Sequence, residues 1–198
     1  MKPIAANSLY ETLMIYLVLQ NATVRRSVQM LENLFERFGE KVRFDGKVLS
    51  VFWEPEKIAK SGEEELRKLK VGYRAKYFLK ISKQFYNNEI EEKKIRKIKK
   101  TELEKTLLSI YGVGKATLEY LLFEDFYFLN ELKTIPPWEH KILSKLIFDK
   151  EKVGEKKILR FFRKYSPYKK LTFHYVWEDL FWRRKKENIE WLEREIRL

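Results

Sequence analysis

The chain has 198 residues, of which 44% are hydrophobic, and it carries a formal net charge of +13 with an isoelectric point of about 9.6. This length suits one domain or two small lobes that share a core, and the apolar content excludes global disorder. The positive charge favours a polyanionic partner, most simply nucleic acid, although an anionic membrane surface is a rival.

The composition also limits the class of protein. No apolar run approaches the roughly 20 residues that a membrane-spanning helix needs, and the N-terminus lacks a signal-peptide pattern. We therefore expect a soluble, cytoplasmic, nucleoid-associated protein without a membrane partner. Cysteine is absent and only His140 and His174 could supply imidazole, so we expect no metal site, no iron–sulfur cluster and no other cofactor. The abundance of Lys and Glu resembles the usage of thermophile proteins.

Apolar side chains recur at helical spacing along most of the chain, which predicts a mostly α-helical protein. In the first half the pattern predicts helices over residues 8–19, 23–38 and 73–86, with a short helix that starts at Pro55 and another that is capped by Ser61. Residues 42–52 are the least helical, and Asp45-Gly46 is a turn signal there. A small β-hairpin and an irregular loop both fit this stretch.

The second half continues the helical pattern. Residues 89–105 are very polar and predict one solvated helix or two short ones. Further helices are predicted over residues 101–110, 115–122, 138–148, about 155–165, about 170–186 and 187–196.

The strongest local motif is the run Tyr111-Gly112-Val113-Gly114-Lys115 between two predicted helices. Glycines permit positive φ and let the backbone approach a ligand closely, and the following helix presents free N–H groups and a positive dipole end. A DNA phosphate fits such a site, with Val113 plugging the turn into the core and Lys115 adding charge. An ordinary helical corner with glycine caps is the alternative, and the net charge favours the phosphate site.

Several segments in a consistent order resemble the helix-hairpin-helix DNA glycosylase superfamily, in the branch of alkylpurine and 8-oxoguanine glycosylases. The most specific segment is Gly72-Tyr73-Arg74-Ala75-Lys76-Tyr77. The others are residues 11–23, residues 35–39 with 45–46 and 52–56, residues 63–67, the hairpin at 111–115 and residues 161–168.

The resemblance implies a fold of two mostly helical lobes with a cleft. We expect a central lobe over residues 22–130, including a helix-hairpin-helix motif at about 101–122, and a second lobe formed by residues 1–21 and 131–198. It also implies a monomer that binds double-stranded DNA with a damaged base and flips that base into the cleft.

The same resemblance assigns roles in DNA binding. The side chains of Gln20 and Asn21, in the loop after the first helix, are expected to fill the gap left by the flipped base. A polar turn between helices is the alternative for either residue. Arg74 and Lys76 are expected to contact DNA together with the hairpin residues.

The family's catalytic Asp has no match in residues 133–143, where Pro136, Trp138 or Glu139 occupies its place depending on the alignment. A carboxylate would stabilise the positive charge that develops on the sugar during base release. Glu139 and Asp125 are the candidate replacements, although Glu139 also suits the first turn of a helix and Asp125 suits a loop. Ala116 occupies the position of the family's Schiff-base lysine, so we expect no lyase activity.

Aromatic residues and a histidine are the candidates for a base pocket, because they stack on or hydrogen-bond to a flipped base. They are Trp53, Trp138, His174 and Tyr175, and a place in the core is the alternative for each.

Three functions remain open from the sequence. The first is a monofunctional glycosylase for a damaged purine, and the second is a non-catalytic protein that binds lesions or DNA structures on the same fold. The third is a module for single-stranded DNA or RNA, which the order of the motifs disfavours.

Overall fold

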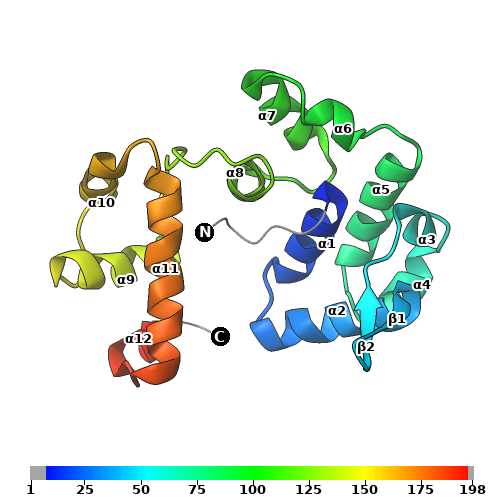
Figure 1. The fold of residues 1–198 in the computed structure, drawn as a ribbon, viewed down its shortest axis with the longest axis horizontal. Coiled ribbons are helices and arrows are strands. Elements are labelled where there is room, and N and C mark those ends of the chain that lie inside the picture. Colours follow the sequence, from blue (N-terminus) through cyan, green and yellow to red (C-terminus); the bar gives the residue numbers. More distant parts are fainter. Residues whose placement is uncertain (1–7, 196–198) are drawn as a thin grey trace. The chain divides into compact units, whose positions relative to one another are not determined.

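A computed structural model describes residues 8–195 of the chain, and Figure 1 shows its course. Apart from one two-stranded sheet, the regular elements of this part of the chain are helices, so the mostly α-helical prediction is confirmed. The described residues fall into two compact units, residues 8–126 and residues 127–195.

The first unit contains a small sheet and eight helices among its described residues. In chain order these elements are α1 (Leu9–Leu19), α2 (Val24–Phe38), β1 (Glu40–Phe44), β2 (Lys47–Val51), α3 (Pro55–Ala59), α4 (Glu63–Lys68), α5 (Arg74–Tyr86), α6 (Glu92–Ile95), α7 (Lys100–Ser109) and α8 (Lys115–Glu124). The polar stretch at 89–105 therefore contains α6 and the start of α7. The predicted cap at Ser61 is wrong, because Gly62 is the N-cap of α4 and the Ser61 hydroxyl donates to the Ile58 carbonyl instead.

Helix α1 lies in the core of this unit. It is apolar on most of its circumference, and Leu9, Leu13, Met14, Leu17 and Val18 are almost completely buried. A helix that is hydrophobic all round must be covered on several sides. Both α2 and α5 pack against it. The boundary of the units thus differs from the expected one, because α1 belongs with residues 24–126 and not with the C-terminal lobe.

The stretch with the Asp45-Gly46 turn forms a hairpin, in which β1 and β2 pair antiparallel with Val42 opposite Leu49. Asp45 and Gly46 both have positive φ, as a tight two-residue hairpin turn requires. Every residue of the two strands is exposed, including Phe44 at 72%. The hairpin therefore adds little to the core of the unit.

The second unit consists of α9 (Pro137–Phe148), α10 (Glu155–Phe162), a 3-10 turn η1 (Arg163–Tyr165), α11 (Lys169–Lys186) and α12 (Glu190–Glu195). These helices enclose a separate core around Ile142, Leu143, Ile158, Phe162 and Leu180. No helix in the described part of the chain is long and apolar enough to cross a lipid bilayer.

Candidate functional site

The turn between α7 and α8 has the backbone that the motif predicts. Gly112 has φ +83°, and the Val113 side chain is buried beneath the turn at 8% exposure. Gly114 is the N-cap of α8, and no side chain caps that helix end. The N-terminal end of α8 therefore has no side-chain cap, and its first residue, Lys115, is exposed, as suits an anion site at a helix N-terminus.

Helix α5 holds this turn in place. The Tyr111 backbone N–H donates to Oε1 of Gln84 at 3.2 Å. The Tyr77 ring lies 5.0 Å from the Tyr111 ring, and Nζ of Lys80 lies 4.0 Å above the centre of the same ring. Residues 77, 80 and 84 share one face of a helix, so a single face of α5 supports the turn.

The N-terminal end of α5 also holds the loop that follows α1. The guanidinium of Arg74 donates to the Leu17 carbonyl at 2.8 Å and to the Gln20 carbonyl. Asn21 adopts a left-handed backbone with φ +48°, and its amide donates to the Tyr73 hydroxyl at 3.4 Å. Gln20 is half-buried and Asn21 is exposed, so the predicted gap-filling side chains lie on a loop whose backbone is fixed.

The prediction that Arg74 contacts DNA is corrected by this geometry. Its side chain is buried at 6% exposure, because the open C-terminal carbonyls of α1 need a donor and the guanidinium provides one. Lys76 and Lys115 are exposed, and their predicted contacts with DNA remain predictions. Val113 can offer DNA only its backbone, because its side chain is in the core.

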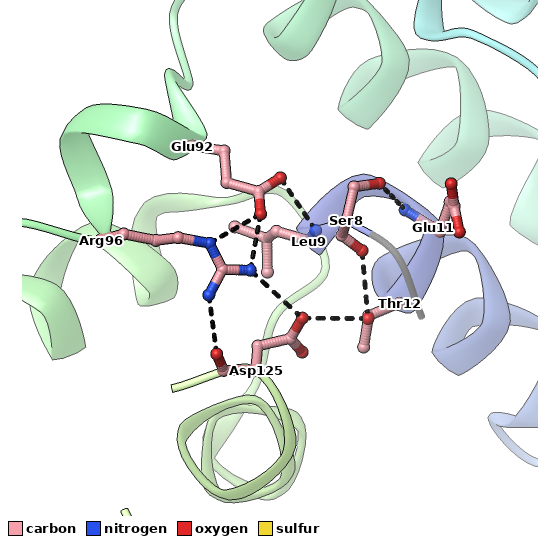
Figure 2. A network of polar contacts seen from close by, with 7 residues as sticks. All are labelled: Ser8, Leu9, Glu11, Thr12, Glu92, Arg96 and Asp125. Atoms are coloured by element: carbon pink, nitrogen blue, oxygen red, sulfur yellow. Dashed lines mark hydrogen bonds and ion pairs between the residues drawn. The ribbon is translucent and has the colours of Figure 1, made fainter. Parts of the chain in front are cut away.

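Asp125 ends α8 and is the centre of the polar network in Figure 2. Oδ1 accepts from the Thr12 hydroxyl at 3.1 Å and lies 4.0 Å from the Arg96 guanidinium. Arg96 also donates to the Asp125 carbonyl at 2.7 Å, and it pairs with Glu92, whose other oxygen accepts from the Leu9 N–H. The network therefore joins the end of α8 to the N-terminus of α1 and to α6.

The environment of Asp125 favours its neutral form. Burial raises the pKa of Asp125 to about 7, although the hydroxyl of Thr12 and the charge of Arg96 lower it. Oδ2 is buried and has no hydrogen-bond partner among the described residues, as a protonated carboxyl oxygen tolerates better than an ionised one. These contacts give Asp125 a structural role in joining helices.

Glu139 lies in the first turn of α9, where it is buried at 3% exposure. The indole N–H of Trp177 in α11 donates to its Oε2 at 2.9 Å. Burial raises the pKa of Glu139 to about 7, against the opposing charge of Lys170 and the hydrogen bond from Trp177. Glu139 and Asp125 belong to different units of the chain.

Comparisons with known proteins identify the family of this chain. The model of the HhH-GPD superfamily of base excision DNA repair proteins matches residues 15–196. The chain belongs to this superfamily. A curated relative, the DNA-3-methyladenine glycosylase of Bacillus subtilis, is 25% identical over 129 residues, which are 65% of this chain and 43% of the relative.

Solved structures of superfamily members share the fold. The 3-methyladenine DNA glycosylase of Archaeoglobus fulgidus has a TM-score of 0.69 and 21% identity, covering 90% of this chain and 61% of that one. The 8-oxoguanine glycosylase/lyase of Clostridium acetobutylicum, bound to DNA, has a TM-score of 0.67 and 22% identity, covering 92% and 61%. The chain thus spans about half the length of these relatives.

Within the superfamily fold, the candidate base-pocket residues have different environments. Trp53 is buried at 2% exposure and stacks on Phe52 at 4.3 Å, so its predicted place in a base pocket is wrong. The side chain of Trp138 lies outside the described residues. His174 is half-buried, with Nε2 3.9 Å from Oε1 of Glu178 on the same helix.

Tyr175 borders a cavity of about 460 Å³ in the second unit. Phe161, Tyr165 and Leu146 also line this cavity, which is more apolar than polar. The predicted pocket role of Tyr175 therefore remains compatible with its position.

Two residues of α5 that support the site, Tyr77 and Gln84, were not predicted from the sequence. Tyr77 was part of a recognised segment, but nothing in the sequence assigned it Tyr111 as a partner, 34 positions away. Gln84 gave no signal, because an isolated Gln on a helix is usually solvated. The supporting roles of Tyr77 and Gln84 follow only from the folded structure, in which α5 lies beside the hairpin turn.

Proposed function

We propose that this superfamily member is a monofunctional DNA glycosylase that flips a damaged purine out of double-stranded DNA and hydrolyses its N-glycosidic bond. The observation that carries the proposal is that α5 holds both the hairpin turn, through Gln84, and the Gln20–Asn21 loop, through Arg74. The first can hold a phosphate and the second can fill the gap in the base stack.

The spacing of these two features suits duplex DNA. Arg74 and Gln84 are ten residues apart in α5. At a rise of about 1.5 Å per residue this is about 15 Å, or four to five nucleotides at about 3.4 Å per step. The phosphate contact is thus a few nucleotides from the flipped base, close enough to hold the strand while that base leaves the stack.

Glu139 is the better candidate for the carboxylate that stabilises the developing charge on the sugar. Asp125 is bound to Thr12 and Arg96 in a network that joins helices, whereas the Glu139 carboxylate accepts one hydrogen bond within the described part of the chain, from the indole N–H of Trp177. A pKa of about 7 leaves a substantial fraction of Glu139 ionised at neutral pH. An ionised carboxylate would act electrostatically on an oxocarbenium-like sugar.

Two features of the sequence support the remaining parts of the proposal. Ala116 cannot form a Schiff base, which supports release of the base without strand cleavage. The absence of cysteine supports a reaction without an iron–sulfur cluster.

A non-catalytic protein that binds lesions is the second candidate. It is favoured by the absence of Asp from residues 133–143 and by the burial of both candidate carboxylates. On this alternative, Glu139 stabilises the second unit through Trp177 and has no part in chemistry.

Base release from duplexes that carry alkylated, deaminated or oxidised purines separates the two functions. We expect the wild type to release one class of base, and Glu139→Gln to lower the single-turnover rate by about 100-fold or more with an unchanged duplex Kd. Glu151→Gln is the matched control, because Glu151 is exposed in the loop after α9 of the same unit. Tight lesion binding by the wild type without release of any base would establish the second function.

A further inference from the structure

A basic cavity of about 600 Å³ lies beside α2, away from the hairpin turn. It is lined by Arg26, Gln29, Asn33 and Arg37 of α2 and by Lys68 and Lys70 at the end of α4 and in the turn after it. The lining residues of α2 lie at intervals of three and four, so they form one face of that helix.

The charges in this cavity favour an anion. It contains four cationic side chains and one carboxylate, that of Glu36, while Arg37 also pairs with Glu65 outside the lining. Lys68 and Lys70 are exposed, and neither has an ion pair within the described part of the chain. Their charges are therefore available to a ligand.

The shape of the cavity is fixed by hydrogen bonds to the backbone. The guanidinium of Arg26 donates to the Lys70 carbonyl, and the Asn33 amide donates to the Leu69 carbonyl at 2.9 Å. Lys70 has φ +60°, which turns the chain back against α2. The two walls are thus tied together before any ligand arrives, which lowers the entropic cost of binding.

The cavity and the hairpin turn adjoin different parts of the segment that holds the gap-filling loop. Lys70 is three residues before Tyr73, whose hydroxyl accepts from Asn21, whereas the hairpin turn contacts α5 one to three helical turns further on, at Tyr77 and Gln84. Figure 1 shows α2 and α7 at opposite ends of this unit. A side chain that fills the gap of a flipped base lies between the two strands. A site beside α2, at the other end of the unit from α7, is therefore a candidate for contact with the strand that the hairpin turn does not hold.

We propose that this cavity binds a backbone phosphate of the strand complementary to the one held by the hairpin. The proposal rests on the proposed function, since it requires duplex DNA with a base-gap loop between the strands. The exposed ammonium groups of Lys68 and Lys70 and the guanidinium of Arg37 would contact the phosphate, and Gln29 would add a neutral donor. Such contacts would place the second strand without reading its sequence.

The test is a scan with single methylphosphonate linkages, which are uncharged, along each strand of a lesion duplex. For the wild type we expect weaker binding from one or two linkages in each strand. The variant Lys68→Gln/Lys70→Gln should lose its sensitivity in the complementary strand alone, and the slope of log Kd against log salt should fall by about one. Its affinity for the single lesion-containing strand should be unchanged.

The control variant is Lys150→Gln/Lys152→Gln, which removes the same net charge from an exposed loop of the second unit. It should retain the sensitivity of both strands. A wild type whose sensitive linkages all lie in one strand, or a Lys68→Gln/Lys70→Gln variant with an unchanged scan, would overturn the assignment. Failure of the proposed function is a separate outcome, because it is seen as absence of base release by the wild type.

Discussion

Gly112 lies directly against the ring of Tyr77. A Cβ atom at position 112 would be 2.8 Å from Cε1 of that ring and closer still to Cδ1. The glycine is therefore required twice, once for its φ of +83° and once for the close approach of the turn to α5.

Gly112→Ala is expected to lower both the stability of the turn and the affinity for duplex DNA. The positive φ alone costs of order 1 kcal/mol for alanine, and displacement of the Tyr77 ring adds to it. Gly114→Ala is the control for stability, because Gly114 has φ −97° and no atom within 4 Å of its added Cβ. Urea unfolding compares the two variants, and equal losses of stability would contradict the role of Tyr77.

Gln84→Leu removes the acceptor of the Tyr111 N–H and keeps an apolar side chain of similar size. The unfolding free energy should fall by about 0.5–1.5 kcal/mol, because the part-buried Tyr111 N–H loses its acceptor. Duplex affinity should fall as well, because the hairpin turn is released from α5. Gln84→Glu keeps an acceptor, so its stability should lie closer to that of the wild type. Unfolding curves and duplex Kd values measure both effects.

Arg74→Ala and Lys76→Ala separate structure from DNA contact. Arg74→Ala should lower the unfolding free energy by several kcal/mol, since it removes hydrogen bonds from a charged donor worth about 1.5–3 kcal/mol each. Lys76 is exposed, so Lys76→Ala should leave stability unchanged and weaken duplex binding with a smaller salt dependence. A stable Arg74→Ala variant with weakened DNA binding would restore Arg74 as a direct contact.

The raised pKa of Asp125 predicts a dependence of stability on pH. The folded protein binds the proton of this carboxyl up to a pH of about 7, whereas the unfolded chain releases it near 3.8. The contribution of Asp125 to stability is therefore greatest at low pH and is lost as the pH rises from about 4 to about 7. Asp125→Asn cannot ionise, so its stability relative to the wild type should increase over this interval. Urea unfolding at pH 5 and pH 8 measures the change, and a constant difference would contradict the raised pKa.

Much of the fold follows from local patterns in the sequence. Ser8 and Thr23 cap α1 and α2 as short polar residues before apolar periodic runs do, and Asp45-Gly46 marks the hairpin turn. Gly112 and Gly114 locate the hairpin turn, because Gly112 has the positive φ that glycine adopts easily and Gly114 begins the next helix as its N-cap. These features depend on residues close in sequence, and so they could be predicted.

The remainder depends on contacts between distant residues. Arg74 was expected to bind DNA because a basic residue in a recognised segment carries no sign of burial, and its acceptors lie 54 and 57 positions away. Trp53 was expected in a pocket, but its partners Phe35 and Phe38 are brought to it by the fold. The role of Asp125 likewise depends on Thr12, 113 positions earlier.

The network at Asp125 also completes a ring of contacts that links α8, α1 and α5. Asp125, at the C-terminal end of α8, is joined through Thr12 to α1. Helix α1 is joined through Arg74 to α5, and α5 is joined through Gln84 to the hairpin turn that precedes α8. Three helices that are linked to one another at three points resist deformation until one helix or one of the linking contacts breaks. On the proposed function, a duplex held at the hairpin turn would press on three joined helices instead of one, so the Gln20–Asn21 loop would keep its position while the base leaves the stack.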